Sequence, residues 1–160
     1  MYNIDDFDMK ILTLLQANGR LTNQELSELV GLSASQCSRR RISLEQAQLI
    51  RGYHARLAPE TVGLGLVGLV GLIEVSLITH AQEQIDSFHQ MLEDVDAILD
   101  AYKTTGDADY LLKVAVADLP ALSEFISQTL SPHKSVAHIK TAVVLNRIKE
   151  NGLLPVTRES

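Results

Sequence analysis

A helix-start signal occurs twice between residues 21 and 52, and it is the feature that most limits how this chain can fold. Residues 22–25 and 33–36 each fit a capping box, in which a Ser or Thr hydroxyl and a Glu or Gln side chain satisfy each other's backbone N–H groups. Gly31 lies between the boxes, where a left-handed residue lets one helix end and the next begin at a steep angle. Two short helices joined by such a turn predict a helix-turn-helix, whose second helix enters the major groove of DNA.

The second of these helices, expected over residues 34–47, carries three consecutive arginines. Such a run is often only a solvated helix face, but after two capping boxes and a glycine turn we interpret it as a DNA contact. Residues early in a recognition helix face base edges, so Ser35, Gln36 and Arg39 are expected to read bases. The next two arginines are expected to hold phosphates. The predicted DNA-binding residues are Ser33, Ser35, Gln36, Ser38, Arg39, Arg40 and Arg41.

The net charge of −6 argues against nucleic-acid binding only until it is divided along the chain. Residues 1–60 carry seven basic and seven acidic side chains, so the part with the helix-turn-helix is neutral overall. The arginine run gives this part a local positive field. Residues 61–160 carry seven basic and thirteen acidic side chains, which account for the whole net charge. This asymmetry predicts a DNA-binding head and a body with a different task.

Composition argues against several other classes of protein. No apolar run reaches the roughly 18 residues that a membrane-spanning helix needs, and the acidic N-terminus lacks the basic region of a signal peptide. Cys37 is the only cysteine, so an internal disulfide or a thiolate metal cluster is excluded, and we expect it to be a small buried residue. The five histidines have no metal-binding spacing on a shared helix. We predict a cytoplasmic protein with no membrane association, no metal site and no cofactor.

Three helices are expected in the head. The first covers residues 5–18, where apolar residues recur at helical spacing, and Gly19 is expected to end it in the left-handed conformation. After the third helix, residues 49–57 are interpreted as a short extended segment that forms a hinge strand. The apolar residues that the second helix, residues 23–30, is expected to bury are Leu26, Leu29 and Val30.

The second half of the chain alternates between strand-like and helix-like patterns. Strands are expected over residues 66–77, 97–104, 110–117 and 138–148, and helices over residues 83–92 and after Asp118. This βαββαβ order is that of the ferredoxin-like fold, an antiparallel four-stranded sheet with two helices on one face. The predicted fold class is α+β, a winged-type helix-turn-helix followed by a ferredoxin-like sandwich domain. The predicted domains are a DNA-binding domain with hinge at residues 1–57, a linker at 58–65 and a second domain at 66–160.

The predicted sheet has a second face that no helix covers. Two chains that press these faces together, or that pair edge strands, would cover it, so we expect the chain to self-associate. A dimer would also present two recognition helices to a pseudo-palindromic site on double-stranded DNA.

The three-helix head, the hinge and the βαββαβ body together resemble the Lrp/AsnC, or feast–famine, family of transcription regulators. The similarity covers nearly the whole chain. Residues 6–12 look like the opening helix of the family, residues 25–33 match strongly, and residues 50–53 follow at the family's spacing. Residues 105–112 resemble the glycine–aspartate turn at which the family binds an amino acid effector between subunits.

The resemblance implies a regulator whose DNA binding or assembly responds to a small amino acid. It also implies homodimers, assembled further into tetramers or into octamers of four dimers. The residues alone leave two interpretations of the turn open. Asp107 and Asp109 cap backbone amides in a tight connection, or one of them accepts a ligand ammonium while amides around Gly106 bind its carboxylate. With the resemblance, the predicted effector-binding residues in the second domain are Thr104, Thr105, Gly106, Asp107, Asp109 and Tyr110.

Two positions depart from the family pattern. Arg41 stands where an aliphatic residue is usual, so we expect its alkyl stem on the core and its charged head at a phosphate. Gln48 stands where the family usually has a glycine, so we expect the third helix to end less sharply.

Two other functions are compatible with this fold. Ferredoxin-like bodies also host catalysts, but no nucleophile–base set and no carboxylate pair with an evident partner emerges, so we do not expect an enzyme. The alternative that stays open is a member of the same fold that binds DNA constitutively as an architectural protein. A change in operator affinity on adding amino acids would separate a sensor from that alternative.

Overall fold

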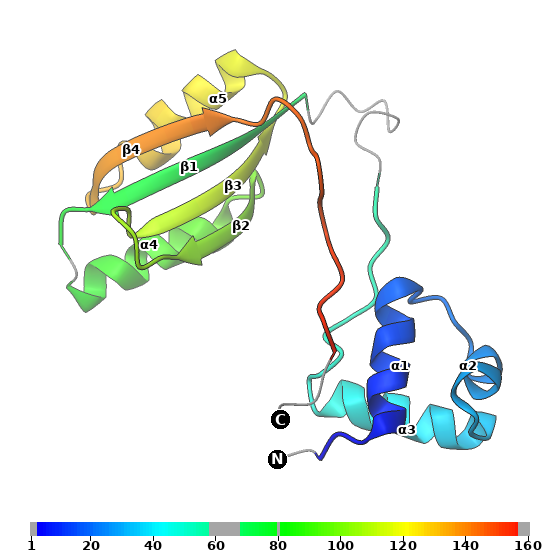
Figure 1. Ribbon diagram of the computed structural model, residues 1–160. Coiled ribbons are helices and arrows are strands. Elements are labelled where there is room, and N and C mark those ends of the chain that lie inside the picture. The colour runs from blue at the N-terminus through cyan, green and yellow to red at the C-terminus, as the bar shows by residue number, and fades with distance from the viewer. Residues whose placement is uncertain (1–2, 58–67, 80, 157–160) are drawn as a thin grey trace. The chain divides into compact units, whose positions relative to one another are not determined.

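The computed structural model describes residues 3–57, 68–79 and 81–156 (Figure 1). Three helices are followed by a four-stranded antiparallel sheet with helices packed on it. The predicted α+β fold, a helix-turn-helix head and a ferredoxin-like body, is confirmed.

The chain divides into two compact units, which are described separately. The head unit comprises residues 1–56 and the C-terminal segment from residue 149, and the body unit comprises residues 57–148. The sequence placed the whole of residues 66–160 in the second domain, but the C-terminal segment hydrogen-bonds to the first helix of the head. The predicted linker, residues 58–65, lies outside the described residues.

Local capping explains where the helices of the head begin. These helices are α1 (Asp6–Ala17), α2 (Asn23–Val30) and α3 (Ala34–Gln46). Thr22 and Ser33 form both predicted capping boxes, and Asp5 forms a third with Asp8. Gly31 has φ 83° and is left-handed as predicted, so α2 ends in the tight turn that leads to α3.

Two predicted helix ends differ in the structure. α1 ends at Asn18 in an extended conformation, and Gly19 is not left-handed. A Cβ atom on Gly19 would lie 3.2 Å from Cδ1 of Tyr53, so this glycine leaves space for a ring. Gln48 takes the left-handed conformation with φ 58°, and the next two N–H groups both donate to Leu44 O. The third helix therefore ends as sharply as with glycine, contrary to expectation.

The core of the head lies where the three helices meet. Burial of an aliphatic side chain contributes roughly 1.5–3 kcal/mol, so this small cluster holds the unit together. Leu29 was expected in this core but is 57% exposed, because Leu26 and Val30 occupy the inner side of α2. The expected hinge strand has no regular secondary structure over residues 51–57. The buried side chains of the core are Ile11, Leu15, Leu26, Val30, Cys37 and Leu44.

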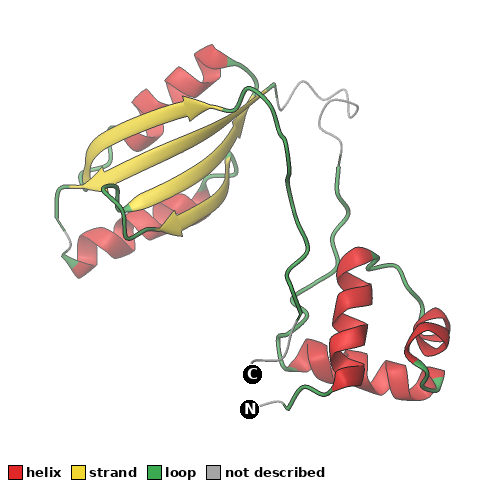
Figure 2. Ribbon diagram, in the orientation of Figure 1, coloured by secondary structure: helices red, strands yellow, loops and turns green. Residues whose placement is uncertain are grey.

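The body has the predicted βαββαβ order, and its strands pair as β2-β3-β1-β4, all antiparallel (Figure 2). Helix α5 continues into one turn of π-helix, residues Ile126–Leu130. The elements are β1 (Leu69–Leu77), α4 (Gln82–Asp94), β2 (Ile98–Lys103), β3 (Tyr110–Val116), α5 (Leu119–Phe125) and β4 (Val136–Val143).

The last strand is shorter than predicted and begins earlier. The sequence placed it at residues 138–148, but β4 stops at Val143, and Val144 N–H donates the last bond to Val70 O near the start of β1. Leu145 and Ile148 follow with 96% and 88% of their surface exposed. Their alternating pattern is typical of a strand, but they lie at or beyond the level of the first residue of β1, where pairing with that strand ends.

The two faces of the sheet differ in their cover. Both helices lie on one face (Figure 2), over the fully buried Ile73, Leu112 and Val114. Strand alternation and register place Leu72 and the neighbouring Glu74 and Leu111 on the other face. Within the part of the chain that the structure describes, no helix covers this second face.

Candidate DNA-binding surface and ligand cavity

The N-terminus of α3 is organised by Ser33 and Gln36. Ser33 N–H and the Ser33 hydroxyl both donate to Gln36 Oε1 at 2.9 Å, and Gln36 N–H donates to Ser33 Oγ at 3.2 Å. The carbonyl end of Gln36 is therefore held in the cap, which leaves its amide nitrogen for a base. Ser35 is exposed beside this cap, with Oγ 3.3 Å from that of Ser33, and Ser38 is half-buried.

Arg40 is engaged inside the head. Its Nη1 donates to Asp8 Oδ1 at 2.7 Å and to Asp5 Oδ1 at 2.9 Å, and its Nη2 lies 2.8 Å from Asp5 Oδ2. The guanidinium also lies 5.4 Å from the centre of the Phe7 ring. The backbone N–H of Asp8 lowers the pKa of Asp5 most, burial opposes it, and Arg40 lowers the pKa further, so that the pKa lies below its ordinary value. Arg40 therefore fastens α3 to the start of α1, and this geometry does not favour the predicted phosphate contact.

Arg41 is held between the recognition helix and the beginning of the hinge. Its guanidinium carbon lies 4.5 Å from the centre of the Tyr53 ring, and its Nε donates to Tyr53 Oη at 2.8 Å. Nη1 donates to Leu21 O at 3.0 Å. Tyr53 in turn donates to Glu45 Oε1 at 2.8 Å, and burial followed by Glu45 raises the pKa of Tyr53. The aromatic stack thus holds an arginine at the position where the resemblance implied an aliphatic residue, and it engages the guanidinium that was predicted to bind phosphate.

Arg39 is the arginine of the triplet that stays available for DNA. Its side chain is exposed, and no hydrogen bond or ion pair joins its guanidinium to another described residue. Helical spacing in the sequence could have distinguished Arg39 from the other two arginines. Positions 40 and 41 follow the buried Cys37 by one turn and therefore lie toward its side of the helix. Position 39 lies away from that side.

The connection between β2 and β3, residues 104–109, closes into a tight loop. Thr104 N–H donates to Asp109 O at 2.8 Å, and Thr104 Oγ1 donates to Ala108 O at 2.5 Å. A Cβ atom on Gly106 would meet no atom within 4 Å, so the apex of the loop borders open space. A ligand can therefore approach the loop backbone closely.

The two aspartates of this loop have different positions. Asp109 Oδ2 accepts the backbone N–H of Leu77 at 2.7 Å, which ties the loop to the end of β1. Asp109 therefore has the capping role that the sequence left as one of two interpretations. Asp107 is exposed and lines a cavity beside the loop. Of the two carboxylates, Asp107 is the one placed to meet a ligand.

The cavity has a volume of about 310 Å³ and takes residues from β1, the loop, β3 and β4. Glu74 and Lys140 line it and were missed by the sequence analysis; their Oε2 and Nζ atoms lie 3.6 Å apart. The fold order could have found them, because a ferredoxin-like sheet places β1 beside β4 and Glu74 is the one charged residue of β1. Thr105 and Asp109, which were predicted for the site, do not line it. The lining residues are Glu74, Thr104, Gly106, Asp107, Ala108, Tyr110, Leu111 and Lys140.

Tyr110 borders this cavity at the start of β3, but its side chain lies on the helix-covered face of the sheet, opposite to that of Leu111. Its side chain is 3% exposed, and its Oη shares a 2.8 Å hydrogen bond with Nε2 of His89 on α4. The ring meets that of Phe88 edge-on, with centres 5.1 Å apart. Burial and, to a smaller extent, the Asp109 carboxylate raise the pKa of Tyr110. The hydroxyl is therefore a neutral group at physiological pH.

The cavity combines charges of both signs in a small volume. Lys140 can pair with a carboxylate, Asp107 with an ammonium, and Leu111 offers an apolar surface for a side chain. A small zwitterion such as an amino acid matches this arrangement.

Among the described residues, no group of three or more His, Cys, Asp or Glu side chains is arranged to hold a metal ion. The described helices include none that is both long and apolar enough to cross a membrane.

Known proteins resemble the chain in both units. Residues 4–45 match the AsnC-type helix-turn-helix domain, and residues 71–154 match the Lrp/AsnC ligand binding domain. The chain is 36% identical over 156 residues to the Bkd operon transcriptional regulator of Pseudomonas aeruginosa, covering 98% of this chain and 100% of that protein. It is 34% identical over 151 residues to the leucine-responsive regulatory protein of Haemophilus influenzae, covering 94% and 89%.

Solved structures resemble the chain over nearly its whole length. A transcriptional regulator of Neisseria meningitidis, crystallised as a complex with L-Met, has a TM-score of 0.88 and 40% sequence identity, and the match covers 96% of this chain and 97% of that one. AsnC of Escherichia coli has a TM-score of 0.83 and 25% identity, with 96% and 100% covered. The named relatives are transcriptional regulators and not enzymes.

Proposed function

Because the chain belongs to the Lrp/AsnC family of transcription regulators, we propose that it recognises operator DNA through Arg39 and binds an amino acid in the cavity beside Asp107. The single observation that carries the DNA-binding part is the exposed Arg39 on a recognition helix whose other two arginines are paired inside the head. A guanidinium free of partners can donate two hydrogen bonds to guanine.

The ligand is a small amino acid, and its zwitterionic part fixes its orientation. Lys140 pairs with the carboxylate and Asp107 with the ammonium, because these groups border one cavity of about 310 Å³. Leu111 then faces the side chain. The relative from Neisseria meningitidis was crystallised with L-Met, so L-methionine is the first amino acid to test.

The open face of the sheet is the proposed contact between two copies of the chain. It carries Leu72, which is 38% exposed, between charged neighbours, and among the described residues no helix covers it. A dimer formed here presents two heads to a pseudo-palindromic operator. Tetramers and octamers would follow from further contacts between dimers. We further propose that this regulator acts in the cytoplasm.

Selection of DNA from a pool of random duplexes by the full chain tests the proposal. A palindromic consensus is expected. Arg39→Ala should cost about 1–3 kcal/mol in binding free energy and relax the preference at one position of each half-site. Lys10→Ala removes the same charge from an exposed position on α1 and serves as the control. Equal losses for the two variants, at every sequence, would exclude Arg39 as the base-reading residue.

A further inference from the structure

The C-terminal segment of the chain is fixed to the DNA-binding head. Leu154 N–H donates to Gln16 Oε1 at 2.8 Å, and Gln16 Nε2 donates to Leu154 O at 3.1 Å. Earlier in the same segment, Asn151 O accepts a hydrogen bond from Arg56 Nη2 at 2.9 Å. The side-chain amide of Gln16 thus pairs with both backbone groups of Leu154, as a neighbouring β-strand would. This contact gives the C-terminal segment (the tail, residues 149–156) a defined register on α1.

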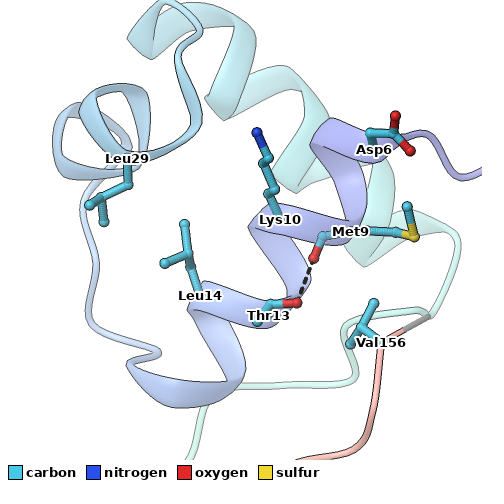
Figure 3. Close-up of a pocket in the computed structure, with 7 residues that line it drawn as sticks. All are labelled: Asp6, Met9, Lys10, Thr13, Leu14, Leu29 and Val156. Carbon is cyan, nitrogen blue, oxygen red and sulfur yellow. Dashed lines mark hydrogen bonds between the residues drawn. The ribbon is translucent and has the colours of Figure 1, made fainter.

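A groove on the head continues this contact. It has a volume of about 610 Å³ and lies between α1 and α2. In Figure 3, Leu14 and Leu29 border it from the two helices, and Val156 of the tail lies near Thr13 on the side of α1. Residues 151–155 are all exposed, whereas Val156 is half-buried. The apolar Leu29, which is not part of the head core, thus lines the same groove as Val156.

The chain therefore joins its two units twice. One connection leaves the head after Arg56, and the other returns from the end of β4 and is fastened at Gln16. Between these anchors, Leu145 and Ile148 are almost fully exposed, so the returning segment makes little contact before it reaches the head. A domain that is joined to its neighbour at two places has fewer accessible orientations than one joined at a single place, so part of the orientational freedom is removed before binding occurs.

We propose that the C-terminal segment, residues 149–156, is a releasable second tether that fixes the orientation of each head for simultaneous binding of two recognition helices to one operator. This rests on the proposed function, in which a dimer binds a palindromic site. The contacts are few and solvent-exposed, and such hydrogen bonds contribute little individually, so the tether can detach without unfolding the head.

The tether is expected to affect DNA binding only when both heads of a dimer bind the same duplex. When one head contacts one half-site, its orientation relative to the second head is irrelevant, and the tether should not matter. When both heads must fit one duplex, a detached tether lowers the effective concentration of the second head at its half-site. Loss of the tether should therefore have a different effect from loss of a residue that contacts DNA or stabilises the helices.

The test compares the full selected operator with a duplex that holds one half-site, using the full-length chain at fixed salt. Gln16→Ala removes both amide bonds, and Val156→Asp places a charge at the groove. Each is expected to lower the ratio of full-site to half-site affinity by about fivefold or more, with half-site affinity unchanged. Gln90→Ala, which removes an amide bond within α4, is the control and should leave the ratio as in the parent.

An unchanged ratio in both tail variants would overturn the proposal. Equal losses on the two duplexes would also overturn it, because they would show that the tail only supports the fold of the head. A parent chain that gains nothing from the second half-site would contradict it as well. The first two results leave the proposed function intact, whereas the third also contradicts its palindromic operator. The proposed function fails as a whole if the parent selects no DNA sequence at all.

Discussion

Nη1 of Arg40 lies 2.7 Å from Oδ1 of Asp8, and this ion pair joins the recognition helix to the first helix of the head. Asp8 is 2% exposed, so its carboxylate has little access to water and depends on the guanidinium for compensation. Asp5, the N-cap of α1, completes the arrangement from the outer side. The orientation of α3 on α1 thus rests on charges as well as on apolar packing.

Replacing Arg40 tests this arrangement through stability. Arg40→Ala is expected to lower the free energy of unfolding of the head by about 2–4 kcal/mol, because it leaves a buried carboxylate without its partner. Urea unfolding followed by circular dichroism measures the change. Arg39→Ala removes an exposed arginine one position earlier and should change stability by less than about 0.5 kcal/mol. Similar losses for both variants would contradict the structural role of Arg40.

Asp5 is expected to make the stability of the head depend on pH. Its pKa is lowered below the ordinary value of 3.8, chiefly by the Asp8 backbone N–H. Its stabilising effect is therefore complete above the pKa of the unfolded chain and is lost as the pH falls through the lower folded pKa. Asp5→Asn keeps a good N-cap residue but removes the charge. The variant should be less stable than the parent at pH 7, and the difference should shrink as the pH falls below 3.8 through the lowered folded pKa. A difference that does not shrink would rule out the charge as its cause.

Gln48 offers a stabilising substitution. It is left-handed at φ 58°, a conformation in which a side chain costs energy that glycine avoids. Gln48→Gly should raise the free energy of unfolding by about 0.5–1 kcal/mol. Gln46→Gly, at the last residue of α3, should instead lower it, by up to about 1 kcal/mol. Thermal unfolding of both variants distinguishes these signs, and a destabilised Gln48→Gly protein would refute the backbone argument.

The two aspartates of the β2–β3 loop should separate ligand binding from stability. Asp107→Ala is expected to weaken amino acid binding at least about tenfold, a loss of about 1.4 kcal/mol, without changing thermal stability. Asp109→Ala should lower stability, because it leaves Leu77 N–H at the end of β1 without its acceptor. Calorimetric titration with L-methionine and thermal unfolding measure the two effects. An unchanged ligand affinity in Asp107→Ala would show that Asp107 does not bind the ammonium and that another carboxylate does.

The sequence predicted best those features that depend on neighbouring residues. Both capping boxes and the left-handed Gly31 form as expected, because their partners lie within one helical turn. The βαββαβ order followed from periodicity and is confirmed. The predicted family is also confirmed, as is the prediction of a transcription regulator and not an enzyme. Cys37 is fully buried, as its position in α3 indicated.

Features that depend on distant residues were missed. Arg40 finds Asp8 across 32 positions of sequence, and a run of arginines does not reveal which of them turns inward. Glu74 and Lys140 meet only after β1 and β4 have paired, so the turn sequence alone could not include them in the cavity. The tail looked like the end of the last strand because Leu145 and Ile148 continue its alternation. Only the length of the neighbouring strand shows where pairing ends.

The affinity of the full-length chain for its selected operator, with and without a saturating amino acid, tests the central claim most directly. Fluorescence anisotropy gives both dissociation constants, after a thermal-shift screen of the twenty amino acids has identified one that stabilises the body. A sensor predicts that the amino acid changes operator affinity by about 5- to 150-fold, and that operator DNA changes amino acid affinity by the same factor. An operator affinity that stays the same with the amino acid bound would contradict the account and leave a constitutive DNA-binding protein in its place.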